Sequence, residues 1–170
     1  MVLDLSLPDR APELGQYGNY NWDDAAFAVY TLLGDRVPLQ DVVQALEKQW
    51  LEQGNENHLV RPTPHVASLE AVRDIVKAHI DLDKGKRDRR DGGAAGDLEW
   101  WPTAFIVVVH EDWRVVPGGL LLVYADDKKD CELHEFFFRV EDAYMMLSSL
   151  SFGDEDLATS QVIYSQIPRK

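Results

Sequence analysis

Cysteine, basic residues and long apolar runs are all scarce in this chain of 170 residues. The single cysteine, Cys131, excludes an internal disulfide framework and is typical of a protein in a reducing compartment. Lys and Arg number 17 against 30 Asp and Glu, and the resulting net charge of −13 disfavours nucleic acid and anionic membranes as partners. No apolar run reaches the roughly 18 residues of a membrane span, and the N-terminus lacks the features of a signal peptide. We therefore expect a cytoplasmic protein, with the nucleus as the alternative.

Sequence motifs of common enzymes are also missing. The chain contains no Gly-rich phosphate loop, no G-x-S-x-G, no C-x-x-C and no H-E-x-x-H. Histidine adjoins carboxylates in His110-Glu111-Asp112 and His134-Glu135, but neither group has a recognised metal-ligand spacing. The sequence therefore assigns no catalytic residue, no metal ligand and no cofactor, and it favours a protein that is not an enzyme.

The residues that are present predict one folded domain over residues 1–170. Hydrophobic residues make up 45% of the chain and aromatic residues 10%, which is enough to build a core. Residues 1–20 contain prolines and glycines and predict an extended arm. Residues 83–97 (DKGKRDRRDGGAAGD) have no apolar period and predict a mobile loop. Its basic cluster at 84–90 is interpreted as a solvated loop, and a nuclear-import signal or a phosphate contact is the alternative.

Apolar spacing predicts an α+β fold, with a small antiparallel sheet of three or four strands packed with about four helices. Helices are expected from about Asn21 to Leu33, Pro38 to Gly54, Ser68 to Ile80 and Glu141 to Leu150. Strands are expected at Phe105–Val109, Leu120–Tyr124 and Leu133–Val140, with a fourth at Gln161–Ile167. The segment Asn55–Ala67 is expected to be a loop.

Negative charge is concentrated near the C-terminus. Residues 126–156 hold ten Asp and Glu against three Lys and Arg, so this stretch carries −7 of the net −13. Such a surface steers a protein toward basic partners, and tryptophan is enriched at the centres of protein interfaces. The residues predicted to bind a partner are Trp100, Trp101, Asp126, Asp127, Asp130, Glu132, Asp154, Glu155 and Asp156.

Three functions remain open on these grounds. The first is a non-enzymatic acidic interaction module, such as an inhibitor or immunity-type partner of a basic protein. The second is a small enzyme or ligand-binding domain with a helix–sheet pocket that uses His110, Glu111 or His134. The third is a homodimeric structural subunit that pairs through the third strand of the sheet.

One part of the chain has a family-like pattern. Residues 101–157 contain the runs FIVVV, GGLLLVYAD, FFFRV and LSSLSFGDEDL in this order. This block resembles a family of small acidic bacterial and fungal proteins known only as a domain of unknown function. The resemblance implies an α+β domain with no assigned activity, and it carries over no functional residue.

Overall fold

The computed structural model of the chain describes residues 3–17, 20–63, 70–82, 98–115, 118–153 and 156–165. The loop expected at 83–97 lies outside the described residues, as do Asp154 and Glu155. None of the helices in the described part of the chain has the length and apolar character that a membrane crossing requires.

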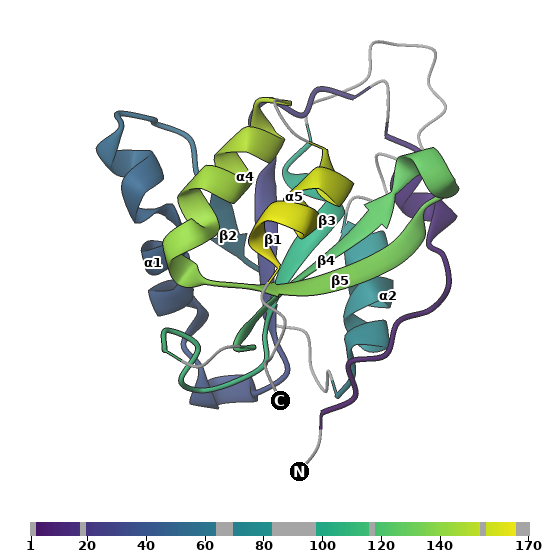
Figure 1. Cartoon of the computed structure of the whole chain (residues 1–170), viewed down its shortest axis with the longest axis horizontal. Helices are drawn as coiled ribbons and strands as arrows, with labels where there is room; N and C mark the ends of the chain where they lie inside the picture. The colour runs from purple at the N-terminus through teal and green to yellow at the C-terminus, as the bar shows by residue number, and fades with distance from the viewer. Residues whose placement is uncertain are drawn as a thin grey trace.

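One mixed sheet of five strands forms the centre of the fold, in the order β2-β1-β3-β4-β5 (Figure 1). β1 runs parallel to both β2 and β3, whereas β3, β4 and β5 form an antiparallel meander. The strands are β1 (Ala26–Thr31), β2 (Val60–Pro62), β3 (Trp100–Val108), β4 (Leu120–Asp126) and β5 (Glu132–Phe138). The α-helices are α1 (Leu39–Glu52), α2 (Val72–Leu82), α4 (Ala143–Ser151) and α5 (Leu157–Tyr164). The 3-10 helices are η1 (Pro12–Gly15), η2 (Gly34–Arg36), η3 (Asp127–Lys129) and η4 (Val140–Asp142).

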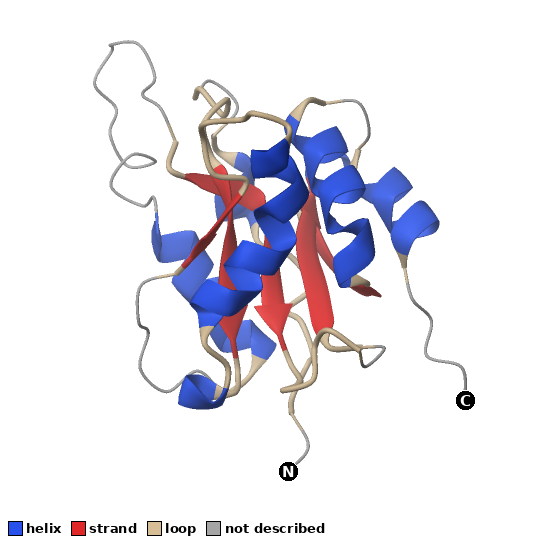
Figure 2. Cartoon of the chain, turned by 90° about the vertical axis from the view of Figure 1, so that its left-hand side faces the viewer, coloured by secondary structure: helices blue, strands red, loops and turns tan. Residues whose placement is uncertain are grey.

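Helices lie on both sides of the sheet, so the fold has three layers (Figure 2). One core joins α1 and α4 to the sheet face that carries Ile106 and Leu122. The other core joins α2 and residues of the N-terminal arm to the face that carries Phe105 and Leu121. Chain direction explains the two faces. The connection β1-α1-β2 runs toward one edge of the sheet, and the connection β2-α2-β3 runs back past β1 in the opposite direction. Because the two crossover connections have the same hand, their helices lie on opposite sides of the sheet.

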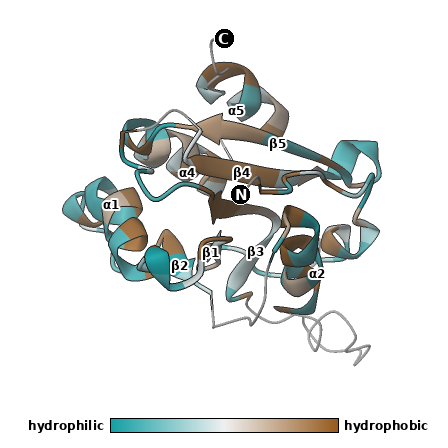
Figure 3. Ribbon diagram, turned by 90° about the horizontal axis from the view of Figure 1, so that it is seen from below, coloured by the Kyte–Doolittle hydropathy of each residue, from teal (hydrophilic) through white to brown (hydrophobic). Residues whose placement is uncertain are grey.

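The class and the meander agree with the sequence prediction. The fold is α+β, the meander β3-β4-β5 is antiparallel, and α1, α2 and α4 cover most of the segments expected to be helical. Figure 3 shows β4 in brown along most of its length, as expected for a strand that is buried on both faces.

The size and type of the predicted sheet were wrong. The sheet has five strands rather than three or four, and it is mixed rather than antiparallel. The segment expected to be a helix from Asn21 contains the interior strand β1, whose residues Ala26–Tyr30 are all buried. A strand buried on both faces is apolar at every position, and its periodicity cannot be distinguished from that of a buried helix.

Two further segments differ from their predictions. β2 lies in the predicted loop and has only three residues, too few for a periodic pattern. The run from Gln161 was expected to be a strand, but its described residues up to Tyr164 belong to α5. Asp156 caps this helix by accepting a hydrogen bond from the Thr159 amide at 2.8 Å.

The N-terminal arm contacts the far edge of the sheet in the described residues. The Leu133 amide of β5 donates to the Asp9 carbonyl at 3.1 Å, and Arg10 forms an antiparallel bridge with Glu132. The Ala11 amide donates to the Cys131 carbonyl at 3.0 Å. These bonds pair the first residues of edge strand β5 with another segment of the same chain.

Candidate functional site

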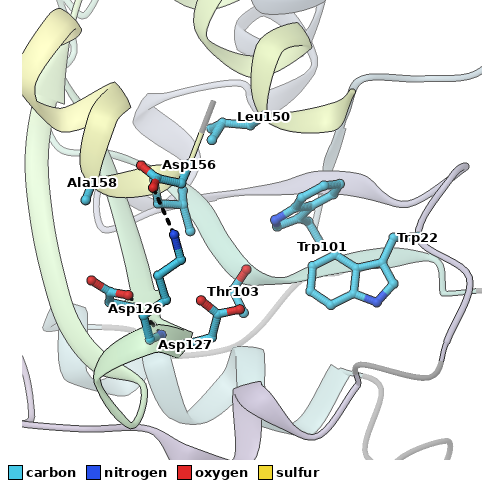
Figure 4. A pocket seen from close by; sticks show the side chains of 10 residues that line it. Trp22, Trp101, Thr103, Asp126, Asp127, Leu150, Asp156 and Ala158 are labelled. Carbon is cyan, nitrogen blue, oxygen red and sulfur yellow. Dashed lines mark hydrogen bonds and ion pairs between the residues drawn. The ribbon is translucent and has the colours of Figure 1, made fainter. Parts of the chain in front are cut away.

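A pocket of about 190 Å³ opens where the end of β4 meets the start of α5 (Figure 4). It lies at the amino-terminal end of the parallel strands, away from the carboxyl ends where open α/β sheets usually bind ligands. Its walls combine two indole rings, three carboxylates and one ammonium. The residues that carry them are Trp22, Trp101, Asp126, Asp127, Asp156 and Lys128.

An irregularity in β3 places Trp101 in this pocket. Between the pairs Ala26↔Trp100 and Ala28↔Phe105, β1 advances two residues while β3 advances five. The extra residues form a bulge, a feature that re-aims side chains and is common beside functional sites. Trp101 consequently packs on the sheet face of Ile106 and Trp100 on the face of Phe105, the reverse of uninterrupted alternation, and only the Trp101 side belongs to the pocket.

The two indole rings of the pocket are packed against other aromatic rings, and they differ in how their N–H groups are bonded. The ring of Trp101 stacks on Phe27 with centroids 4.8 Å apart, and it meets the ring of Trp22 edge to face at 4.9 Å. The Trp22 indole donates to the Tyr17 carbonyl at 2.9 Å. The Trp101 indole nitrogen is buried and has no hydrogen-bond partner among the described residues. Figure 4 shows this nitrogen on the edge of the ring turned toward Thr103 and Asp156.

The acidic wall is held by local hydrogen bonds. Asp126 accepts from the Lys128 amide at 3.0 Å, and Asp156 accepts from the Thr159 amide. The Lys128 ammonium donates to Asp156 Oδ2 at 3.2 Å across the pocket. Hydrogen bonds from Thr159 and then Lys128 lower the pKa of Asp156 to about 2, so this carboxylate is ionised at neutral pH.

Burial and the nearby carboxylates raise the pKa values of two groups beside the pocket. Burial raises the pKa of Tyr124 to about 12, and the charges of Asp126 and Asp156 add to the rise. Burial also raises the pKa of the Cys131 thiol, and the charge of Asp127 acts in the same direction. A raised pKa disfavours the thiolate, so Cys131 is not placed as a nucleophile.

The turn that carries Asp127 and Lys128 is strained. Asp130 and Cys131 both have left-handed backbone conformations, with φ of 55° and 58°. Such conformations are costly for residues other than glycine and tend to persist where the surroundings require them. The Cys131 amide closes this turn by donating to the Asp126 carbonyl at 2.9 Å.

The remaining residues predicted for partner binding lie elsewhere. Trp100 is only 9% exposed and packs in the core on the α2 side. Asp130 is exposed and forms an ion pair with Arg10 at 3.2 Å. Glu132 pairs with the His134 ring at 2.9 Å. Trp22 was missed by the sequence prediction, because nothing in its local pattern indicates which tertiary neighbours it will meet.

The residues of the predicted enzyme alternative do not converge. His110 and Glu111 follow β3, and Glu111 forms an ion pair with Arg36 at 3.3 Å. His134 lies toward the opposite end of the meander, beside Tyr124 in the register and stacked on its ring at 5.3 Å. None of these three residues lines the pocket at Trp101 or the groove beside Glu47, and His134 lies apart from the other two in the described meander.

A different histidine and carboxylate do meet in a groove of about 480 Å³ between α1 and β2. Glu47 of α1 is only 3% exposed, and its Oε1 lies 3.0 Å from Nδ1 of His58. The other carboxylate oxygen, Oε2, is buried and has no partner among the described residues. Sequence reasoning missed this pair, since Glu47 reads as one polar position in a helix.

The described residues include no group of three or more His, Cys, Asp or Glu side chains arranged to hold a metal ion. Comparison of the chain with protein-family models, with curated proteins and with solved structures gave no match. The family resemblance of residues 101–157 therefore stays a prediction.

Proposed function

We propose that this protein is a non-enzymatic binding module for a basic protein, of the inhibitor or immunity type. One observation carries the proposal. Trp101, Asp126, Asp127 and Asp156 were each predicted for partner binding, and they line one pocket although they come from separate elements. A centre with aromatic surface surrounded by charge is the arrangement typical of interface hot spots.

The charge balance of this region supports a basic partner. Three carboxylates face one ammonium in the pocket, on a chain whose net charge is −13. Unneutralised carboxylates at a surface attract basic proteins over a range set by salt and accelerate their association. Two of these carboxylates, Asp126 and Asp156, are also positioned by hydrogen bonds, so little ordering of these two is needed when a partner binds.

Neutralising the pocket tests the proposal. The variant Asp126→Asn, Asp127→Asn, Asp156→Asn should lose capture of basic proteins from lysate, and the salt dependence of capture should flatten. The matched control, Asp35→Asn, Asp41→Asn, Glu52→Gln, removes the same charge from exposed positions on η2 and α1. The control should retain capture, because screening weakens the contribution of distant charges. Equal capture by both variants, or capture of proteins without basic character, would contradict the proposal.

A second candidate is a small-molecule site in the groove between α1 and β2. The observation in its favour is the buried, unpartnered Oε2 of Glu47 beside His58. Buried carboxylate oxygens are normally hydrogen-bonded, so a donor on a ligand would stabilise this one. A ligand found by screening should lose affinity in Glu47→Gln and keep it in the triple pocket variant. The homodimer also stays a prediction, which mass measurement across a range of protein concentrations tests.

A further inference from the structure

We propose that the pocket at Trp22 and Trp101 binds the primary ammonium of a partner's lysine side chain, and that Lys128 occupies the place of that ammonium until it is displaced. This inference rests on the proposed function and identifies the chemical group recognised. Lys128 therefore serves as an internal model of the partner's lysine.

The contact of Lys128 shows which group the pocket accommodates. Its side chain lines the pocket, and its ammonium donates to Asp156 Oδ2 at 3.2 Å. Asp126 and Asp127 border the same space. An ammonium is a compact donor of three hydrogen bonds and can satisfy several carboxylates that are not coplanar, whereas the planar guanidinium prefers one carboxylate in bidentate geometry.

The internal contact is weak enough to be replaced. The side chain of Lys128 is 73% exposed and that of Asp156 is 47% exposed. Exposed ion pairs of this kind contribute about 0–1 kcal/mol. A lysine from a partner gains the same contact and also brings its main chain against the aromatic wall.

The aromatic wall indicates that the ligand is a peptide rather than a free amine. The Trp101 indole nitrogen is a buried donor without an acceptor among the described residues. A protonated amine offers no acceptor, whereas the main-chain carbonyl of a partner's lysine does. The rings of Trp22 and Trp101 meet at 86°, and an ammonium near such faces gains a cation–π contribution.

Short peptides in solution test this assignment. The probes are acetyl-Gly-Lys-Gly-amide and its arginine and Nε-acetyllysine counterparts, and the readout is the indole N–H signals of the ¹⁵N-labelled protein. The chain has five tryptophans, so Trp50, Trp100 and Trp113 serve as internal references. The lysine peptide should shift the Trp101 and Trp22 signals and leave those of the reference residues in place. The other two peptides should bind more weakly.

Removing the Lys128 ammonium gives the decisive comparison. Lys128→Met should bind the lysine peptide more tightly, up to about fivefold, which corresponds to the about 1 kcal/mol of an exposed ion pair. Lys129→Met changes the net charge equally on the same short helix, but Lys129 does not line the pocket. This control should gain less affinity than Lys128→Met, because Lys129 forms no ion pair with a pocket carboxylate that its removal would release, and physiological salt weakens what its charge alone contributes.

Several results would overturn the inference. These are equal binding of the acetyllysine or arginine peptide, no gain in Lys128→Met, or an equal gain in Lys129→Met. If the peptide fails to bind while the triple pocket variant still loses capture of basic proteins, the ammonium site is wrong and the acidic docking surface remains. If capture is also unaffected, the proposed function fails with it.

Discussion

Replacing His79 by glutamine should flatten the pH dependence of folding stability on the acid side of neutrality. His79 lies on α2 and is 3% exposed. Its Nε2 donates to the Trp101 carbonyl at 2.9 Å, and its Nδ1 lies 2.9 Å from the Tyr30 hydroxyl. Burial lowers the pKa of His79 from 6.5 to about 4, against the smaller opposing effect of the Trp101 and Pro102 backbone. The folded protein therefore holds this ring neutral.

The sign and size of the effect follow from proton linkage. As the pH falls below 6.5, the unfolded chain takes up a proton on this histidine before the folded chain does. The contribution of His79 to stability is thus complete above pH 6.5, declines toward pH 4, and is constant below that. A shift from 6.5 to about 4 corresponds to about 3 kcal/mol in total, of which about 2 kcal/mol is lost by about pH 5.

Urea denaturation followed by circular dichroism, from about pH 7 down to about pH 4, measures this loss. His79→Gln is the matched variant, because a glutamine amide can donate to the Trp101 carbonyl but does not titrate. It should cost stability at neutral pH, and its deficit relative to the natural chain should shrink by about 2 kcal/mol by about pH 5. If the unfolding free energies of the two proteins change in parallel with pH over this range, His79 is not a buried, uncharged ring.

Two further substitutions test the sheet. Glu135 has a buried oxygen without a partner among the described residues, and burial raises the pKa of its carboxyl from 4.5 to about 7. The folded chain therefore binds this proton more tightly than the unfolded chain, and stability is lost as the pH rises from 4.5 through 7. Glu135→Gln should be the more stable protein in urea titrations above that range. A gain in stability that does not vary with pH would contradict this. Phe105→Ala should cost about 3–5 kcal/mol of unfolding free energy, since the ring is 1% exposed. Phe152→Ala, at a 65% exposed site, is its control, and equal thermal shifts would show that the burial of Phe105 is wrong.

Helices with one buried face were predictable from the sequence. Val42, Val43, Leu46 and Trp50 are all buried, and their spacing produces the apolar stripe that predicted α1. The runs of β4 and β5 were predictable for a related reason, since turn-forming residues separate short apolar stretches. In each case the sequence signal lies in residues close together in the chain, so a local reading suffices.

The local pattern failed at two strands, β1 and β2. β1 is buried at every residue from Ala26 to Tyr30, so no period distinguishes a strand from a helix there. β2 has three residues and is a strand only because it pairs with β1. These two strands make the sheet mixed, and their pairing partners are far away in the sequence.

By itself the sequence determined the α+β class, the one-sided helices and a strongly acidic C-terminal region, because each depends on composition or on spacing within a short window. Only the tertiary structure decided which acidic residues lie together in one pocket. The bulge in β3 turns Trp101 toward Trp22, and the strained turn after β4 brings Lys128 to Asp156. The register of a strand and the packing of a distant helix set these contacts, and both are properties of the whole chain that no local window contains.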